Sequence, residues 1–405
     1  MAAGGVNLNL ATTTPTLDTK NWQAFSPAGD TLRDWMNEYA LPLWAKWSWD
    51  DRRGGFRECL GFDGNPCTEP FRRLFVQARQ IYVFSAAHLL GWDRSAIALA
   101  NNGFDYLTSH GWLMSGGWAH KLDGDGLVID KTRDTYDHAF ILFAMAWYYR
   151  ATGENDAIVW AERTLSYLDS SLIDPVHGGY QENLNHDLPR RANPHMHLLE
   201  ALLALYDATS DIAYLDRANR LANLMKRAFF DQSTGSIGEF FHKDWSASRA
   251  NAGHHREPGH QFEWAFLLDS LEVRSGEDFS KEIRALVSFT NQYGINTATG
   301  LVHDVVDAVG RPIITSHHLW CQSEAIRARL MLASRGFDNQ IQKAVELTNA
   351  VFHHHLTPVM EGLWHGMVGH DGVPIDAAVP ASTLYHLMTL HWDIETRARL
   401  ADKKA

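Results

Sequence analysis

The chain has 405 residues, of which 45% are hydrophobic and 21% charged, and its formal net charge is -12 at pH 7. This length and apolar content allow a sizeable core, while the acidic balance excludes nucleic acid and anionic membrane as the main partners. A neutral small molecule is the partner that the charge favours.

Two features of the sequence bear on the cellular compartment. Residues 1–20 contain neither a basic region nor a sustained apolar stretch, and no later run reaches membrane-spanning length. We therefore expect a loose leader over residues 1–20, no membrane partner and a cytoplasmic location. Cys59, Cys67 and Cys321 are odd in number and lack C-x-x-C spacing. They indicate neither a disulfide framework nor a zinc ribbon, which favours a reducing compartment.

Six glycine-opened polar stretches recur along the chain, and each leads into long apolar runs. The glycines are Gly55, Gly117, Gly179, Gly235, Gly300 and Gly362, with successive spacings of 62, 62, 56, 65 and 62 residues. Regular spacing of this size is typical of a repeat architecture. The repeat outweighs the two or three domains that the length alone would suggest, so we predict a single catalytic domain over residues 21–405.

Each unit predicts a turn-rich loop followed by two helices. The first helix of each pair is expected at about residues 72–90, 134–151, 194–208, 258–274, 317–334 and 381–394. The second helices fill the intervals. Residues 211–230 illustrate a second helix, because their apolar side chains recur at spacings of three and four and form one stripe.

The first helices are apolar around most of their circumference, as residues 139–144 and 198–205 show. Helices of this kind belong inside a core, whereas helices with one apolar stripe belong outside. We therefore predict an all-α fold, a closed (α/α)6 barrel with the first helices as its inner ring. An open solenoid is the structural alternative, but it requires polar capping repeats, and no such caps are visible.

The starts of the six inner helices should surround one central pit in such a barrel. The side chains at these starts are Arg79, Tyr136, His197, His260, Trp320 and His386. Aromatic faces stack on sugar C–H surfaces, arginine and histidine hydrogen-bond hydroxyls, and histidine titrates near neutral pH. Most of the 22 histidines are expected to be ordinary surface or core residues, but the convergence of three at one pit predicts a sugar site.

Other chemistries find less support in the sequence. His195 and His197 lie about 200° apart on a helix and no H-E-x-x-H motif occurs, so no metal is expected. Glycoside hydrolysis needs two carboxylates flanking a bond. Glu263 instead follows His260 by three residues, and we expect it to orient that imidazole. No phosphate-binding glycine loop occurs, so no nucleotide cofactor is expected.

Six segments of the chain carry a family resemblance. They are VQARQIYVFS, TYDHAFILFAMA, NPHMHLLEALLAL, PGHQFEWAFLL, WCQSEA and VPASTLYHL, and they extend over nearly the whole chain. Together they resemble the N-acylglucosamine 2-epimerase superfamily and, within it, the bacterial mannose isomerases. The resemblance implies an (α/α)6 barrel, a metal-independent aldose isomerisation or 2-epimerisation, and acid/base roles for His260 and His386. It also implies sugar contacts at Arg79, Tyr136, Asn193, His197, Glu263 and Trp320, to which we add Gln322 of the WCQSEA segment.

Single segments discriminate among the subfamilies. His197 stands where acetamido-sugar epimerases have an apolar residue, which disfavours them. Cellobiose 2-epimerases share the H-x-H pattern of His195 and His197, and sulfosugar isomerases share the N-x-x-M-H spacing. The segment VPASTLYHL is more similar to mannose isomerases. We therefore expect interconversion of mannose and fructose, with an aldose 2-epimerase and a non-catalytic sugar-binding protein as the alternatives.

The expected mechanism is proton transfer through a cis-enediol. Arg79 would stabilise the developing oxyanion, His260 would open the pyranose ring with support from Glu263, and His386 would move the C2 proton to C1. Delivery to the opposite face of C2 would give the epimer. The expected partner is a small-molecule sugar. No cofactor, metal or nucleic acid is expected, and a homodimer remains possible.

Overall fold

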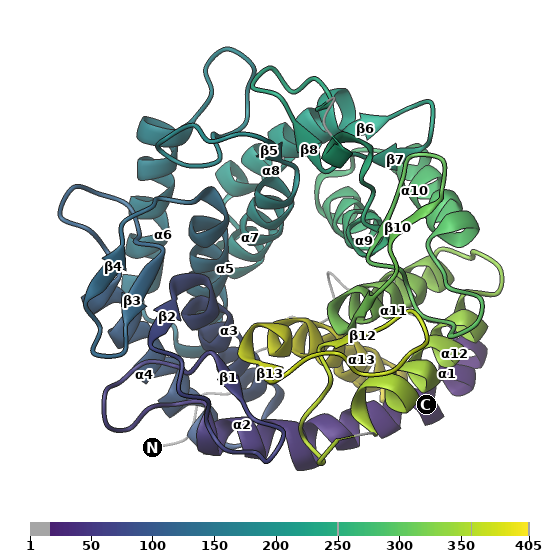
Figure 1. Cartoon of the computed structure of the whole chain (residues 1–405), viewed down its shortest axis with the longest axis horizontal. Helices are drawn as coiled ribbons and strands as arrows, with labels where there is room; N and C mark the ends of the chain where they lie inside the picture. The colour runs from purple at the N-terminus through teal and green to yellow at the C-terminus, as the bar shows by residue number, and fades with distance from the viewer. Residues whose placement is uncertain (1–16, 249–250, 358, 404–405) are drawn as a thin grey trace.

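The computed structural model describes residues 17–248, 251–357 and 359–403. Over these residues the helices form two concentric rings around a common centre (Figure 1). The inner ring consists of α3 (Leu74–Leu90), α5 (Thr135–Thr152), α7 (Asn193–Thr209), α9 (Pro258–Ser275), α11 (Leu319–Ser334) and α13 (Leu384–Asp402). The outer ring consists of α1 (Thr19–Trp35), α2 (Leu41–Trp47), α4 (Arg94–His110), α6 (Asp156–Tyr167), α8 (Ile212–Leu224), α10 (Ser280–Tyr293) and α12 (Gln340–Val351). The predicted closed (α/α)6 barrel is confirmed, and the open solenoid is wrong.

Short irregular helical segments accompany the rings. In the described chain, four π-helical turns adjoin outer helices, at Met36–Ala40, Leu168–Leu172, Met225–Phe229 and Phe352–Leu356, and 3-10 turns occur at Asn251–His254 and Ala381–Thr383. Three inner helices, α3, α5 and α9, end at glycines with φ of 74–79°, namely Gly91, Gly153 and Gly276. This left-handed conformation ends a helix at little steric cost only for glycine.

A hydrogen-bonded clamp gives the sequence repeat its physical basis. In five units of the described chain, a buried side chain of the inner helix accepts the backbone N–H of a residue in the preceding loop. The pairs are Gln77 with Phe56, His138 with Trp118, His195 with Tyr180, Gln261 with Ile237, and Gln322 with Val302. Each clamp side chain also donates to a backbone carbonyl, so it fixes the loop on the helix start without leaving a buried polar atom unpaired.

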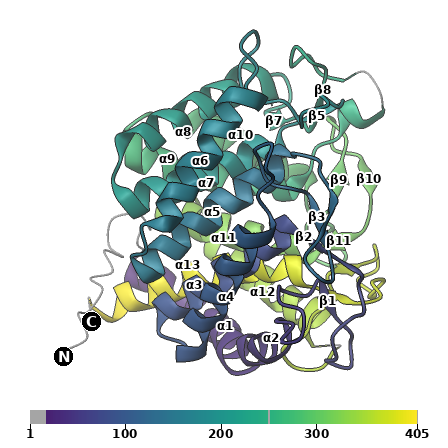
Figure 2. The ribbon, with the colours of Figure 1, turned by 90° about the vertical axis from the view of Figure 1, so that its left-hand side faces the viewer.

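The loops pair with their neighbours around one end of the barrel, where Figure 2 shows the strands gathered. Antiparallel pairs join β1 (Cys59–Leu60) to β13 (Val379–Pro380), β2 (Phe71–Arg73) to β3 (Lys121–Asp123), β5 (Arg190–Arg191) to β8 (Phe240–Phe241) and β11 (His317–His318) to β12 (Met367–Val368). Single bridges, Asp134 to Asn183 and Arg256 to Val306, link the two remaining neighbours. Hairpin strands β4 (Val128–Asp130), β6 (Phe230–Asp231), β7 (Ser236–Ile237), β9 (Val305–Val306) and β10 (Pro312–Ile314) complete the loops. The all-α prediction did not anticipate these strands.

The two ends of the chain close the ring. The described part of the chain begins with the outer helix α1 and ends with the inner helix α13, so α1 is the outer partner of the last inner helix. The expected order, inner helix before outer helix, therefore fails at the ends. Asp18 caps α1 at Thr19, so the expected leader of residues 1–20 is two residues too long, and residues 1–16 lie outside the described residues.

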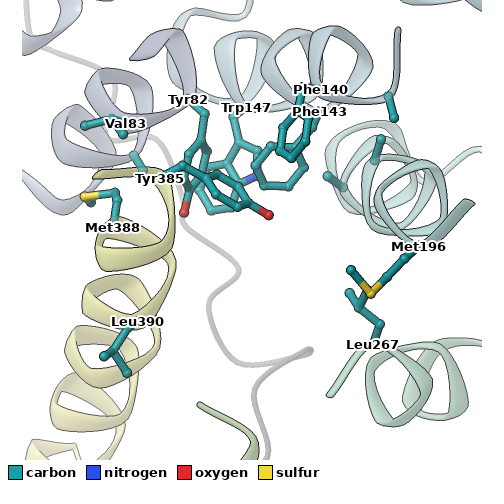
Figure 3. Close-up of a cluster of buried hydrophobic side chains, with 14 of the residues drawn as sticks. Tyr82, Val83, Phe140, Phe143, Trp147, Met196, Leu267, Tyr385, Met388 and Leu390 are labelled. Carbon is teal, nitrogen blue, oxygen red and sulfur yellow. The ribbon is translucent and has the colours of Figure 1, made fainter. Parts of the chain in front are cut away.

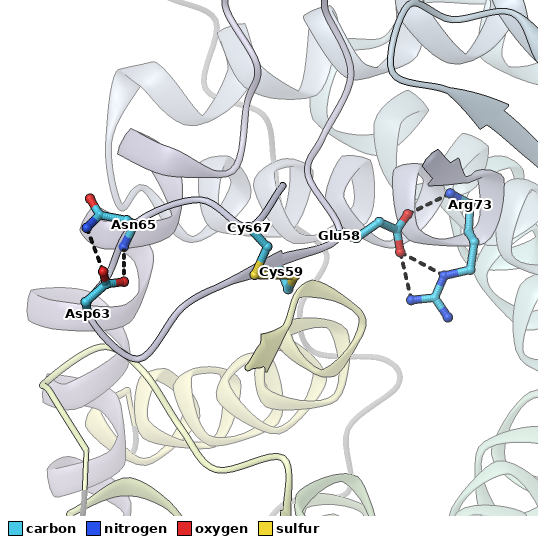
Figure 4. Close-up of a disulfide and its surroundings, with 6 residues drawn as sticks. All are labelled: Glu58, Cys59, Asp63, Asn65, Cys67 and Arg73. Carbon is cyan, nitrogen blue, oxygen red and sulfur yellow. Dashed lines mark hydrogen bonds and ion pairs between the residues drawn. A yellow bond between two sulfur atoms is a disulfide. The ribbon is translucent and has the colours of Figure 1, made fainter. Parts of the chain in front are cut away.

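A disulfide joins Cys59 and Cys67 (Figure 4), whereas Cys321 is free and buried. The expectation that the cysteines form no disulfide is therefore wrong for this pair, because β1 and the following turn bring them together with a Cα–Cα distance of 5.5 Å. Close by, the Glu58 carboxylate accepts from the Arg73 side chain at 2.7 Å. None of the described helices combines the length and apolarity that crossing a membrane requires.

Candidate active site

The structure brings together the six side chains expected at the central pit. Arg79 donates to the hydroxyl of Tyr136 at 2.8 Å, and the ring of Tyr136 lies 5.4 Å from that of His197. The Trp320 ring lies between two imidazoles, with centroid distances of 5.0 Å to His260 and 5.6 Å to His386. Tyr136 and Trp320 are half-buried and the other four are buried. In this arrangement the guanidinium and the three imidazoles adjoin aromatic rings, as expected of the central pit.

Arg79 is a buried cation without a carboxylate partner in the described part of the chain. Its guanidinium donates to the Ser382 carbonyl at 3.0 Å and to Tyr136, and it lies 4.1 Å from the ring centroid of Phe140 and 4.8 Å from that of Tyr385. Neutral oxygens and aromatic faces leave its positive charge uncompensated. A developing oxyanion in the pit would receive that charge.

Two carboxylates hold the imidazole of His260. Its Nδ1 lies 3.0 Å from Glu239 and 3.2 Å from Glu257, and neither carboxylate forms an ion pair with an arginine or lysine in the described chain. Burial by itself would lower the pKa of His260, but Glu257 and Glu239 raise it to about 10. His260 is therefore an imidazolium at neutral pH.

The expectation that Glu263 orients His260 is wrong. Its two carboxylate oxygens are buried without a hydrogen-bond partner among the described residues, and the nearest imidazole nitrogen with which it pairs is Nδ1 of His197, at 3.7 Å. Burial and the neighbouring Glu324 and Glu200 hold the pKa of Glu263 well above its usual value. These surroundings disfavour the charged form of the Glu263 carboxyl group.

His386 has one carboxylate partner, and that partner is neutralised. Nδ1 of His386 lies 2.7 Å from Glu324, whose other oxygen accepts from Arg327 at 2.6 Å. Burial lowers the pKa of His386 to about 4, because Glu324 offsets the desolvation only in part. His386 is therefore a neutral imidazole at pH 7, and its protonation state is opposite to that of His260.

The third histidine follows the same pattern of support. Nδ1 of His197 lies 3.1 Å from Glu200, whose oxygens accept from the Tyr385 hydroxyl at 2.5 and 2.6 Å. Burial lowers the pKa of His197. Nowhere in residues 17–248, 251–357 and 359–403 does a side chain or backbone group hydrogen-bond Nε2 of His197, His260 or His386. All three imidazoles can therefore use this nitrogen in the pit.

Two residues expected to bind substrate behave differently. Asn193 begins α7, and its amide oxygen is buried without a partner among the described residues, so it is available to a sugar hydroxyl. Gln322 has no such freedom. Its amide oxygen accepts from Val302 at 2.7 Å and its amide nitrogen donates to the carbonyls of Val302 and His318. The expectation that Gln322 contacts substrate is corrected, because it is the loop clamp of its unit.

Three clusters in the described chain have ligand atoms close enough to share one cation, within 4.8 Å of one another. They are His197 with Glu200 and Glu263, Glu239 with Glu257 and His260, and Glu263 with Glu324 and His386. The expectation of no metal rested on the spacing of His195 and His197 and on the missing H-E-x-x-H motif, and neither pattern reveals clusters whose members are far apart in the sequence. In each cluster Nδ1 of the histidine already contacts a glutamate, which accounts for the proximity without a metal. Metal independence stays a prediction.

The family profile described as N-acylglucosamine 2-epimerase (GlcNAc 2-epimerase) matches residues 54–390. The chain belongs to the N-acylglucosamine 2-epimerase family. The family resemblance is thereby confirmed, and the protein is an enzyme of a family of sugar isomerases and epimerases.

Members of the N-acylglucosamine 2-epimerase family resemble this chain over most of its length. A mannose-6-phosphate isomerase of Rhizobium meliloti is 30% identical over 384 residues, covering 90% of this chain and 96% of its own. A D-mannose isomerase of Marinomonas mediterranea is 27% identical, covering 85% and 91%. The structure of a cellobiose 2-epimerase from Bacillus thermoamylovorans superposes with a TM-score of 0.83 at 21% identity, covering 92% and 100%, which supports the barrel fold.

Proposed function

We propose that the protein is an aldose–ketose isomerase that interconverts free mannose and fructose. The observation that carries the proposal is the different support of two imidazoles that both lie against Trp320: two glutamates without a cation hold His260, whereas the one glutamate on His386 is shared with Arg327. An enzyme that opens a pyranose ring and then removes a C–H proton needs one acid and one base at the same pH. The mannose isomerase relative supports the choice of sugar.

Each residue has a defined task in the proposed reaction. His260, as an imidazolium, donates a proton to the ring oxygen and takes back the proton of the C1 hydroxyl, so the pyranose opens to the aldehyde and His260 is again charged. His386, as a neutral imidazole, removes the proton from C2, and Arg79 stabilises the negative charge that develops on the carbonyl oxygen. His386 then delivers the proton to C1, while the hydroxyl proton on C2 moves to the oxygen on C1. The atoms balance, since the ketose is an isomer of the aldose.

Aldose 2-epimerisation is the second candidate, and one observation favours it. His260 is charged and its ring lies 5.0 Å from that of Trp320, which also lies 5.6 Å from the ring of His386, so a second acid stands beside the same tryptophan and could return a proton to the other face of C2. The product then would be glucose rather than fructose. A non-catalytic sugar-binding protein is disfavoured because pure binding needs no pair of histidines with opposite charge states.

We further propose that the sugar is not phosphorylated, although one relative is named a mannose-6-phosphate isomerase. Apart from Arg79, which the proposed reaction commits to the oxyanion, two arginines border the site in the described rim, and both are compensated by carboxylates. Arg73 pairs with Glu58 at 2.7 Å, and Arg191 pairs with Glu182. A phosphate would have to displace these partners, because phosphate recognition needs uncompensated donors.

A substrate screen tests this proposal. The purified protein is incubated with mannose, mannose 6-phosphate, glucose and cellobiose, with and without a chelator, and the products are identified. We expect fructose from mannose, a much lower kcat/KM for the phosphate ester, and no effect of chelation. Loss of turnover on chelation that a divalent cation restores would contradict the proton-transfer scheme. The cytoplasmic location and the homodimer are predictions that fractionation and sedimentation would test.

A further inference from the structure

A cavity of about 90 Å³ lies between the later turns of the inner helices, toward the end of the barrel opposite the candidate site. Arg150, Asp207 and Arg274 lie at its outer end and are partly exposed, whereas Glu200 and Arg327 lie at its inner end and are buried. None of the three pit histidines lines this cavity. It is therefore a second internal space, distinct from the pit.

Two arginines of the cavity wall have carboxylate partners. Arg274 donates to the two oxygens of Asp207 at 2.7 and 2.6 Å. Arg327 donates at 2.6 Å to Glu324, which lies outside the wall. The charges of these two arginines are thereby compensated by the protein itself.

Arg150 differs, because it forms no ion pair within the described residues. Its guanidinium lies 4.2 Å from the ring centroid of Trp147 and 5.5 Å from that of Trp392. Burial lowers the pKa of Arg150, and the negative charge of Asp207 offsets this effect only in part. A cation that is largely removed from water is normally paired with an anion, so the charge of Arg150 is available to one.

The free polar atoms of the wall are hydrogen-bond donors. Among the described residues, the buried side-chain atoms of the wall without a partner are the hydroxyl of Tyr82, Nε1 of Trp147 and Nε of Arg327. Tyr82 and Trp147 come from neighbouring inner helices, with ring centroids 4.9 Å apart, and lie together in the barrel interior (Figure 3). Indole and guanidinium N–H groups only donate, and a phenol can donate. The cavity therefore needs an acceptor.

The two carboxylates of the wall do not supply that acceptor. Both oxygens of Asp207 accept from Arg274, and both oxygens of Glu200 lie 2.5–2.6 Å from the hydroxyl of Tyr385. A water molecule must donate its own hydrogens as well as accept, and among the unpaired buried side-chain atoms of the described wall only the Tyr82 oxygen can accept one. A small anion accepts from several donors at once and also compensates Arg150.

We propose that this cavity binds a small monovalent inorganic anion, of the class of chloride, through Arg150 and the indole N–H of Trp147. One uncompensated arginine requires one negative charge. A water molecule needs about 30 Å³, so the cavity has room for an ion of similar size together with one or two waters. The bound anion stabilises the far end of the barrel, and its binding does not depend on the proposed function.

Thermal unfolding in two salts tests the site. A ligand that binds only the folded state raises the melting temperature, whereas gluconate is too bulky to enter the cavity. We expect sodium chloride to raise the melting temperature of the parent by about 2–3 °C more than sodium gluconate at the same ionic strength. Arg150→Gln should lose this difference.

Arg163→Gln is the matched control. The Arg163 guanidinium also lies over two tryptophan rings, 4.4 Å from the centroid of Trp112 and 4.8 Å from that of Trp160, but it is outside the cavity wall. This variant should therefore keep the chloride-specific rise. Equal melting temperatures of the parent in chloride and gluconate, or a chloride-specific rise that Arg150→Gln retains, would overturn the proposal.

A crystal structure of the parent protein grown with bromide tests the site even where Arg150→Gln fails to fold. Bromide replaces chloride and is located by its anomalous scattering. We expect one bromide within hydrogen-bond distance of Nε1 of Trp147. A cavity that holds only water would overturn the proposal. A bromide there without any chloride-specific rise in melting temperature would also overturn it, because binding would then occur at crystal concentration only.

Discussion

His260 and His386 have opposite charge states because their carboxylate partners differ in compensation. Glu239 and Glu257 act on His260 without a cation to balance them, whereas Glu324 is shared between His386 and Arg327. Burial penalises the imidazolium in both places, so the uncompensated charge of the neighbours decides the outcome. The proposed roles of acid and base therefore rest on the environment of each histidine and not on residue type.

The pH profile of kcat/KM tests this assignment. The parent should be active between the pKa of His386, about 4, and that of His260, about 10. Glu257→Gln removes one carboxylate that stabilises the imidazolium, so the pKa of His260 falls and the alkaline limb moves to lower pH. The acid limb should not move. Glu277→Gln, at an exposed site, is the matched control, and an alkaline limb that stays in place in Glu257→Gln would refute the assignment.

Exchange of the C2 proton separates the roles of the two histidines. His386→Asn removes the base, so we expect exchange of the C2 hydrogen with solvent to disappear and kcat to fall by about 10²- to 10⁴-fold. His260→Asn slows ring opening but leaves the base in place, so residual turnover should still involve C2 exchange. Nuclear magnetic resonance of mannose in deuterated water measures both. Parent-rate exchange in His386→Asn would show that another group is the base.

At the scale of the elements, the loop clamps connect the repeat to stability. Glutamine and histidine occupy equivalent positions, since both accept from a loop N–H and donate to a carbonyl. A histidine can accept through Nε2 only while it is neutral. Burial lowers the pKa of His138 to about 4 and that of His195 to about 3, which keeps the clamps intact at neutral pH.

His195→Gln should make the fold more resistant to acid. An unfolded histidine titrates near pH 6.5, whereas His195 in the fold titrates near 3, so the unfolded state binds more protons between these values and stability falls as the pH is lowered. At pH 5 this difference lowers the free energy of unfolding of the parent by about 2 kcal/mol. The His195→Gln variant should not lose this stability, because glutamine does not titrate. Gln261→His is the reverse control and should add acid sensitivity. Urea unfolding at pH 5 and pH 7 measures the free energy of unfolding of each variant. If this free energy falls equally from pH 7 to pH 5 in the parent and in His195→Gln, the clamp argument is contradicted.

At the scale of the whole molecule, the first and last described elements of the barrel meet, so we expect the barrel to unfold as one cooperative unit. Phe25 of α1 is fully buried, and a side chain at Gly29 would collide with Phe25 and approach Ile394 of α13. Arg33 of α1 pairs with Glu395 of α13 at 3.1 Å. β1 and β13 close the rim on the other side. The first and last elements are thus held by packing, charge and backbone hydrogen bonds.

Phe25→Ala tests the cooperative closure. Truncating a fully buried phenylalanine should lower the free energy of unfolding by about 3–5 kcal/mol. Because α1 completes the ring, the loss should appear in a single transition of the whole barrel rather than as separate melting of α1. Circular dichroism and tryptophan fluorescence should therefore give coincident unfolding curves. Two separate unfolding transitions, or a decrease of less than about 1 kcal/mol in the free energy of unfolding, would contradict the cooperative closure of the barrel.

The fold and the set of residues at the pit were predictable from the sequence. The hydrogen-bond and ion-pair partners of these residues were less predictable. Inner helices were predictable because burial on all sides leaves a continuous apolar run, as in α5. Glu239 was missed as a partner of His260 because it comes from a loop 21 residues away, while Glu263 at i+3 faces His197 instead. Gln322 sits in a family-like segment, so its position suggested substrate binding although its hydrogen bonds serve the loop.

The central claim is most directly tested by the labelled product that mannose gives in deuterated water. One base serving C2 and C1 acts on one face of a planar enediol, so the account predicts fructose that carries deuterium at C1, formed faster than any other product. Glucose labelled at C2 and formed as fast as fructose would contradict it, because both faces of C2 would then be served and the enzyme would be a 2-epimerase.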